Sequence, residues 1–215
     1  MATFEDPESM DGVSLISEAY RQQLRQMHAN KAQFGVGGAE IPQQVKQLLE
    51  TYSIKTVLDF GAGKGLFTQA MRQRYPQIDT VAYDPAFEAL SDKPDQVDMV
   101  YSSDVLEHVE PDRLDETLAD LFERCTQVQY HHIACHPARK RLPDGRNAHL
   151  IIESPAWWKA QFQRFGWPIV SETVQSGETT KKGQTLMRVF YTIVVTCPSG
   201  QPEPARPTAG YERRQ

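Results

Sequence analysis

Apolar residues are distributed along the chain in two different patterns. Short continuous apolar runs, typical of buried strands, occupy 56–60, 80–83, 97–102 and 128–134. Spacings of three or four residues, typical of helices, occupy 14–27, 42–51, 66–74, 114–124 and a segment from Pro155 to Gly166. Because the two patterns alternate, we predict an α/β fold: a Rossmann-like, doubly wound, mostly parallel sheet with helices on both faces.

The C-terminal part of this pattern predicts a β-hairpin. Apolar runs at 169–174 and 186–196 are separated by the polar segment 176–184, which we interpret as the turn. The hairpin would add an antiparallel strand to the sheet. Upstream of it, residues 136–150 are polar, basic and rich in turn formers, and we expect a long loop there.

These elements predict a single domain over residues 13–197. Residues 1–12 are polar, and residues 198–215 are Pro-rich with few apolar side chains, so we expect disorder in both. The N-terminal residues do not resemble a secretory signal, and no apolar run is long enough to span a bilayer. We therefore expect a cytoplasmic protein with no membrane partner.

Charge and cysteine content narrow the class of function. Lys and Arg number 23 against 28 Asp and Glu, a formal net charge of −5, which disfavours an extensive nucleic-acid surface. The cysteines are Cys125, Cys135 and Cys197; they form no CxxC pair and indicate reduced thiols rather than disulfides or a metal motif.

The most informative segment is Asp59–Gly65, which follows the first predicted strand. Gly61, Gly63 and Gly65 allow a tight turn into a helix and let a ligand approach the backbone. This spacing differs from the dinucleotide motif G-x-G-x-x-G. Asp84 ends the next strand, where a carboxylate accepts hydrogen bonds from ribose hydroxyls in nucleotide-binding folds. Asp59 is placed to orient the loop or to receive an ammonium group.

The strings VLDFGAGKG, VAYDP and DMVYSSDVLEHVEPDRL together resemble class I S-adenosylmethionine-dependent methyltransferases over roughly residues 54–196. The segments MH…FGVGG and LPDGRNAHL…WW are similar to those of small methyltransferases from phage and bacterial genomes. The resemblance implies S-adenosylmethionine as cofactor. The cofactor-binding residues that we predict are Asp59, Gly61, Gly63, Gly65, Asp84, Ser103 and Asp104.

Two further features are predicted around this cofactor site. The connection between Asp84 and Asp98 is too short for a complete helix and strand, so we consider Ser91 and Asp92 for the adenine contact. The FGVGG segment at 34–38 is interpreted as a lid over the cofactor or as an ordinary helix cap.

The catalytic candidates are Glu107, His108 and His149. Glu107 and His108 stand three and four residues after Asp104, so in a first helical turn the three side chains would converge on one side. His149 would approach them from the loop. Two carboxylates and two imidazoles form a plausible Mg²⁺ or Mn²⁺ site. This arrangement resembles the E-x-x-E-H and distal His of small-RNA 3′-end 2′-O-methyltransferases, although the first position here is Asp. Alternatively, Glu107 and His108 only cap and orient the helix.

Three functions remain open from the sequence. The first is methyl transfer to an oxygen or nitrogen atom of a small metabolite, sugar or nucleotide. The second is methylation of a nucleic acid, of the RNA 2′-O type; base-amine methylation is disfavoured because Ser102-Ser103-Asp104 stands where an Asn/Asp-Pro-Pro-Tyr motif is expected. The third is a non-catalytic binding or scaffold module. The cationic run Arg139–Arg141 with Arg146 suits a phosphate or carboxylate on the acceptor, or is simply solvated.

Overall fold

The computed structural model describes residues 14–30, 40–181 and 184–196. The α-helices are α1 (Glu18–Asn30), α2 (Gln43–Thr51), α3 (Leu66–Arg74), α4 (Leu114–Arg124) and α5 (Pro155–Arg164). The strands are β1 (Thr56–Phe60), β2 (Asp79–Tyr83), β3 (Val97–Ser103), β4 (Cys125–Ala134), β5 (Ile169–Lys181) and β6 (Gln184–Thr196). Short 3-10 turns are η1 (Glu88–Leu90), η2 (Leu106–His108) and η3 (Pro111–Arg113).

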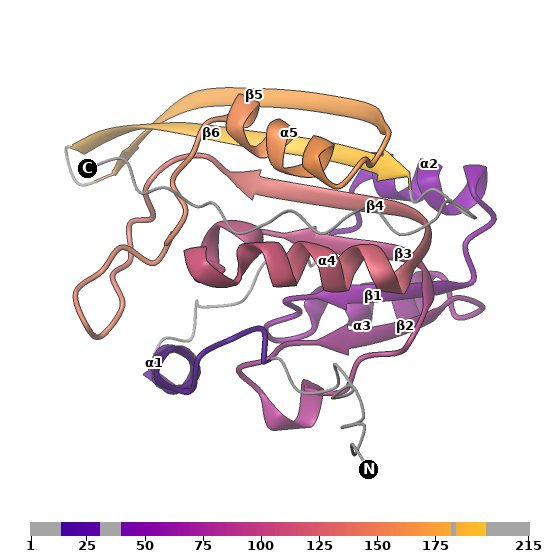
Figure 1. Cartoon of the computed structure of the whole chain (residues 1–215), viewed down its shortest axis with the longest axis horizontal. Helices are drawn as coiled ribbons and strands as arrows, with labels where there is room; N and C mark the ends of the chain where they lie inside the picture. The colour runs from indigo at the N-terminus through magenta and orange to yellow at the C-terminus, as the bar shows by residue number, and fades with distance from the viewer. Residues whose placement is uncertain (1–13, 31–39, 182–183, 197–215) are drawn as a thin grey trace, which may run out of the picture.

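The strands form one sheet in the order β2-β1-β3-β4-β6-β5 (Figure 1). Strands β1 to β4 run parallel to one another, whereas β6 runs antiparallel to both β4 and β5. This is the predicted Rossmann-like fold, with a mostly parallel sheet and a C-terminal antiparallel hairpin.

Helices cover both faces of the sheet because the parallel strands are apolar on both sides. Leu58 and Val57 are neighbours on β1 and pack into different clusters. Leu58 belongs to the cluster that includes Leu118 of α4 and Trp158 of α5, and Val57 to the cluster that includes residues of α2 and α3. Figure 1 shows α4 and α5 in front of the sheet and α2 and α3 behind it. Burial on both faces explains why these strands are continuous apolar runs.

The predicted turn at 176–184 is wrong. Strand pairing continues through this segment, from Ser176 opposite Val189 to Lys181 opposite Gln184. The segment is polar because both faces of the distal hairpin contact water, which an antiparallel ribbon tolerates when its backbone groups are paired. Even apolar residues of the hairpin are exposed, Val174 by 55% and Met187 by 55%.

The other boundaries differ from prediction by a few residues; β4, for example, starts at Cys125 rather than at 128. The predicted disordered ends 1–12 and 198–215 and the FGVGG segment lie outside the described residues. None of the helices in the described ranges has the length and apolar character needed to cross a bilayer.

The carboxyl ends of β1, β2, β3 and β4 meet at one edge of the sheet. Helix α1 and the loop between β4 and α5 lie at that edge (Figure 1). Between β2 and β3 the chain forms only η1 instead of a helix, as expected from the short connection. Ligands of open α/β sheets bind at this edge.

Candidate active site

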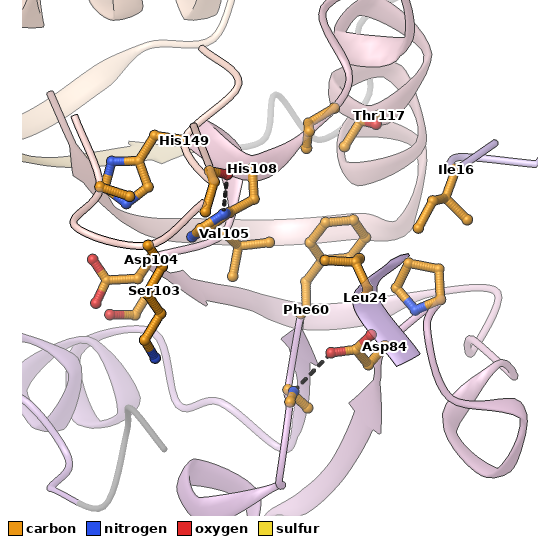
Figure 2. Close-up of a pocket in the computed structure, with 18 of the residues that line it drawn as sticks. Ile16, Leu24, Phe60, Asp84, Ser103, Asp104, Val105, His108, Thr117 and His149 are labelled. Atoms are coloured by element: carbon orange, nitrogen blue, oxygen red, sulfur yellow. Dashed lines mark hydrogen bonds between the residues drawn. The ribbon is translucent and has the colours of Figure 1, made fainter. Parts of the chain in front are cut away.

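A cavity of about 470 Å³ lies at the carboxyl edge of the parallel strands. It is enclosed by the glycine loop, the ends of β2 and β3, the residues around η2, helix α1, the 136–149 loop and β6. Figure 2 shows Asp84 and His149 at opposite ends, with Phe60 and Val105 between them. A cavity of this size is typical of sites for cofactors and other small ligands.

The glycine loop forms the floor of the cavity beside β1. Gly61, Gly63 and Gly65 all have positive φ angles, of 75°, 54° and 70°. At Gly61 a Cβ atom would lie 2.5 Å from two methyl carbons of Val105, so the residue also allows a close approach. Gly61 and Gly63 line the cavity. Gly65 does not; its left-handed conformation forms the N-cap of α3, so it shapes the turn rather than contacting the ligand.

Asp84 links the loop to the end of β2. Its Oδ2 accepts a hydrogen bond of 2.9 Å from the Gly63 amide (Figure 2). Its Oδ1 accepts a second one, also of 2.9 Å, from the Ala86 amide. The side chain is buried, and burial raises its pKa. Each carboxylate oxygen accepts more than one hydrogen bond, so Asp84 retains acceptor capacity toward the cavity that it lines.

Asp59 at the end of β1 orients the start of α3. Its Oδ2 accepts hydrogen bonds from the Thr68 hydroxyl at 2.7 Å and the Thr68 amide at 3.2 Å. Burial raises the pKa of Asp59 to about 6. The two hydrogen bonds from Thr68 stabilise the charged carboxylate and therefore partly oppose this rise. Asp59 therefore holds the loop against the helix, as the first of its two predicted roles requires, and it also lines the cavity.

Helix α1 covers the cavity from the side of Asp84. Ile16, Tyr20 and Leu24 face the cavity, and the Tyr20 hydroxyl donates a hydrogen bond of 2.9 Å to the His108 carbonyl. The amide and hydroxyl of Ser17, just before α1, donate to the Glu110 carboxylate, each at 2.7 Å. These contacts attach the N-terminal helix to the segment that carries the catalytic candidates.

The end of the cavity opposite Asp84 contains the imidazoles of His108 and His149. Their rings meet edge to face, with centroids 4.9 Å apart. His108 Nδ1 is 2.7 Å from the Ala148 carbonyl, and His149 Nδ1 is 2.5 Å from the His136 carbonyl. A carbonyl only accepts, so each Nδ1 carries the hydrogen when the ring is neutral, and each Nε2 keeps its lone pair.

Glu107 lies behind these histidines and is fully buried. Its Oε1 accepts a hydrogen bond of 3.0 Å from the Ala134 amide, and its Oε2 has no hydrogen-bond partner among the described residues. One donor atom each from Glu107, His108 and His149 lies within 4.8 Å of the other two. Two imidazoles and a carboxylate are ligand types that divalent metals accept.

Burial controls the protonation of these groups. It lowers the pKa of His108 to about 4 and also lowers that of His149. It raises the pKa of Glu107 well above its ordinary value, and the Asp104 carboxylate raises it further. At neutral pH both imidazoles are therefore uncharged.

Three predicted placements are wrong in part. Asp104 and Ser103 line the cavity, but Asp104 contributes no atom to the three-residue donor cluster. It precedes the 3-10 turn η2 and has a φ of 55°, so the α-helical convergence assumed for Asp104, Glu107 and His108 does not form. Ser91 and Asp92 do not line the cavity.

Only part of the cationic run predicted at 139–146 reaches the cavity. Arg139 and Lys140 line the cavity, whereas the other two arginines bond within their own loop. Arg141 donates to the Gly145 carbonyl, and Arg146 forms an ion pair with Asp144.

Several residues of the cavity were not predicted from the sequence. Ile16, Tyr20 and Leu24 were assigned to a helix without a function, and Arg188 was not connected with the site, whereas His136 was expected at this edge of the sheet and does line the cavity. No local signal marks them, because they reach the cavity through the packing of α1 and of β6 against β4.

Comparison with known proteins agrees with the geometry. A family profile described as a methyltransferase domain matches residues 38–172, more than half of the chain. No curated protein matches the sequence.

Several solved structures share the fold. The 1,6-didemethyltoxoflavin-N1-methyltransferase of Burkholderia thailandensis, solved with 1,6-didemethyltoxoflavin and S-adenosylhomocysteine, is 14% identical with a TM-score of 0.55; the match covers 87% of this chain and 93% of that one. A putative O-methyltransferase of Nostoc punctiforme is 17% identical with a TM-score of 0.51, covering 80% of this chain and 59% of that one. The protein belongs to the methyltransferase-domain family and is an S-adenosylmethionine-dependent methyltransferase.

Proposed function

We propose that the protein transfers the methyl group of S-adenosylmethionine to an oxygen or nitrogen atom of a small molecule. One observation carries the proposal: a single cavity joins the Asp84 carboxylate at the glycine loop to the neutral imidazoles of His108 and His149. When bound, S-adenosylmethionine supplies a methyl group on a positively charged sulfur, which is open to in-line displacement by a well-aligned acceptor.

The residues at the Asp84 end suit the adenosyl part of this cofactor. The free acceptor capacity of Asp84 matches two ribose hydroxyls, and the backbone at Gly61 and Gly63 lets a ligand approach closely. Ile16, Leu24 and Pro85 present apolar surface on the same part of the cavity, suited to the adenine ring. In this arrangement α1 excludes water from the cofactor.

The residues at the other end suit removal of the acceptor's proton. His149 is half-buried and lines the cavity, and its Nδ1 is fixed by the His136 carbonyl. Its Nε2 is therefore the atom that accepts a proton. His108 packs edge-on against this ring and is neutral, so it orients His149 without adding charge repulsion.

A divalent metal ion is a second candidate for this step, favoured by the donor cluster of Glu107, His108 and His149 and by the unpartnered Glu107 Oε2. These three side chains would hold Mg²⁺ or Mn²⁺, and the ion would lower the pKa of an acceptor hydroxyl. The fixed Nδ1–H hydrogen bonds to carbonyls are typical of metal-binding histidines.

A small acceptor is favoured over a nucleic acid for four reasons. The net charge is −5, and the Asn/Asp-Pro-Pro-Tyr motif of base-amine methylation is absent at 102–104. The Burkholderia thailandensis methyltransferase that shares this fold was solved with 1,6-didemethyltoxoflavin and S-adenosylhomocysteine bound. The cavity, of about 470 Å³, is of a size typical of small-ligand sites.

Calorimetry with S-adenosylhomocysteine, followed by a labelled-methyl assay on a panel of small molecules and RNA, tests the proposal. His149→Gln should lower turnover by about 100-fold or more while leaving the dissociation constant of S-adenosylhomocysteine unchanged. The matched control is His132→Gln, because His132 does not line the cavity and bonds to Thr192 instead. Equal losses of turnover and cofactor affinity in His149→Gln would give His149 a structural role, and labelled RNA would favour the nucleic-acid alternative.

The metal candidate has its own test. If the donor cluster binds a metal, EDTA abolishes turnover, Mg²⁺ or Mn²⁺ restores it, and Glu107→Gln removes this response. Full turnover in excess EDTA would leave His149 as the proton acceptor without a metal.

A further inference from the structure

We propose that the methyl acceptor carries an anionic group, a phosphate or a carboxylate, which Arg139, Lys140 and Arg188 bind at the end of the cavity farthest from Asp84. This inference rests on the proposed function and names the class of its substrate. It follows from the way charge is distributed along the cavity.

Positive charge is gathered at one end only. Arg139 and Lys140 come from the loop after β4, and Arg188 comes from β6, yet all three line the cavity next to His136 and His149. At the opposite end the cavity is lined by the carboxylates of Asp59 and Asp84. One carboxylate, that of Asp104, lies near His149 at the basic end, where the three cations outnumber it. Glu110 also lines the cavity and accepts hydrogen bonds from Ser17. The cofactor is positively charged at its sulfur and amino group, so the acidic end suits the cofactor and the basic end suits a negatively charged acceptor.

Arg188 is held in a defined orientation. Its guanidinium carbon lies 4.7 Å from the centre of the Phe190 ring, and its Nε is 3.5 Å from Nε2 of His136. The His136 ring is fixed in turn by its Nδ1, which lies 2.9 Å from the Val189 carbonyl. A guanidinium stacked on an aromatic ring keeps donors for a bidentate contact, and little side-chain freedom remains to be lost on binding.

Arg139 completes the cluster from the other segment. Its guanidinium donates a hydrogen bond of 3.4 Å to the Thr179 carbonyl on β5, which connects the loop with the distal hairpin. The distal part of the hairpin, which the sequence analysis interpreted as a turn, therefore supports the basic end of the cavity. This gives the unusual length of β5 and β6 a role in the site.

The positions of the cations indicate a small anion rather than a nucleic acid. A nucleic-acid surface needs a basic track many residues long, because it neutralises successive phosphates. In the neighbouring part of the loop, Arg146 is paired with Asp144 and Arg141 with the Gly145 carbonyl.

NMR of the arginine Nε–H groups, in protein saturated with S-adenosylhomocysteine, tests the inference. Inorganic phosphate and acetate, titrated separately at constant ionic strength, should shift the Arg139 and Arg188 signals in a saturable manner. The tighter of the two anions identifies the acceptor group as phosphate or carboxylate. Arg188→Gln should weaken this binding roughly tenfold, as expected for loss of one charge-assisted contact. Arg141→Gln is the matched control and should leave it unchanged.

The outcomes separate the two proposals. Failure to bind S-adenosylhomocysteine would overturn the proposed function itself. Normal S-adenosylhomocysteine binding without a saturable anion response, or with the same anion affinity in Arg188→Gln, would overturn only the anionic acceptor. Single-stranded RNA that competes with phosphate, with an affinity that increases with its length, would overturn the small acceptor in favour of a nucleic acid.

Discussion

Replacing Asp84 tests the cofactor site most directly, because its carboxylate has two separable tasks. It accepts hydrogen bonds of 2.9 Å from the Gly63 amide and the Ala86 amide. We propose that it also accepts hydrogen bonds from the ribose hydroxyls of the cofactor. A hydrogen bond to a charged acceptor contributes about 1.5–3 kcal/mol. Loss of two hydroxyl contacts in Asp84→Ala should therefore weaken S-adenosylhomocysteine binding by at least about 100-fold.

The loop contribution must be measured separately. Asp98 is a matched control, because its Oδ2 also accepts two backbone amides, those of Lys55 at 2.7 Å and Thr56 at 3.0 Å, without lining the cavity. Asp98→Ala should lower the free energy of unfolding in urea by about 1–3 kcal/mol and leave cofactor affinity unchanged.

Calorimetry with ribose analogues isolates the hydroxyl contacts. Wild-type protein should bind more weakly when the 2′- or 3′-hydroxyl of S-adenosylhomocysteine is replaced by hydrogen. Asp84→Ala should bind the deoxy analogues almost as well as it binds S-adenosylhomocysteine itself. This is a double-mutant cycle with one change made on the ligand. If the deoxy analogues weaken binding equally in both proteins, the ribose contact lies elsewhere and the assignment of Asp84 fails.

Three further predictions concern the loop, its neighbour and the proton acceptor. Gly65→Ala should lower the free energy of unfolding in urea by about 1–2 kcal/mol, because the left-handed backbone of this residue disfavours a Cβ atom. Gly61→Ala should lower it clearly more, because its Cβ would also lie 2.5 Å from Val105. Equal losses would show that Val105 moves freely. Because burial raises the Asp59 pKa from 3.8 to about 6, the stability that this group contributes below pH 4 is lost as the pH rises through 6. At pH 8 the free energy of unfolding of Asp59→Asn, measured in urea, should therefore exceed that of the wild type by up to about 3 kcal/mol, and this difference should vanish near pH 4. A difference independent of pH would mean that the charge of Asp59 is not its cause. The lowered pKa of His149 predicts turnover that is constant above pH 7 and falls in acid as the imidazole is protonated; an unchanged acid limb in His149→Gln would assign the proton to another group.

The sequence by itself determined the layers of the fold and the glycine-loop end of the cavity, where we propose that the cofactor binds. Continuous apolar runs marked the strands buried on both faces, and helical spacing marked the helices between them. The glycine loop and Asp84 were found because each directly follows a strand, and the carboxyl ends of adjacent parallel strands meet at one edge. These features depend on short stretches of chain, so local pattern was sufficient to predict them.

Tertiary structure alone decided how distant segments complete the cavity. Helix α1 packs against the 136–149 loop, and β6 pairs with β4, which brings Tyr20 and Arg188 to a cavity that neither residue's local sequence indicates. The hairpin was predicted too short because its polar segment was interpreted as a turn. A paired antiparallel ribbon with both faces in water is also polar, and this is what the segment forms. Asp104 was included in the metal cluster because an α-helical turn was assumed, whereas its left-handed backbone is followed by a 3-10 turn. Its carboxylate stays close enough to raise the pKa of Glu107 but is not one of the three clustered donors. Such contacts depend on packing between residues far apart in the chain, and periodicity within one segment does not encode them.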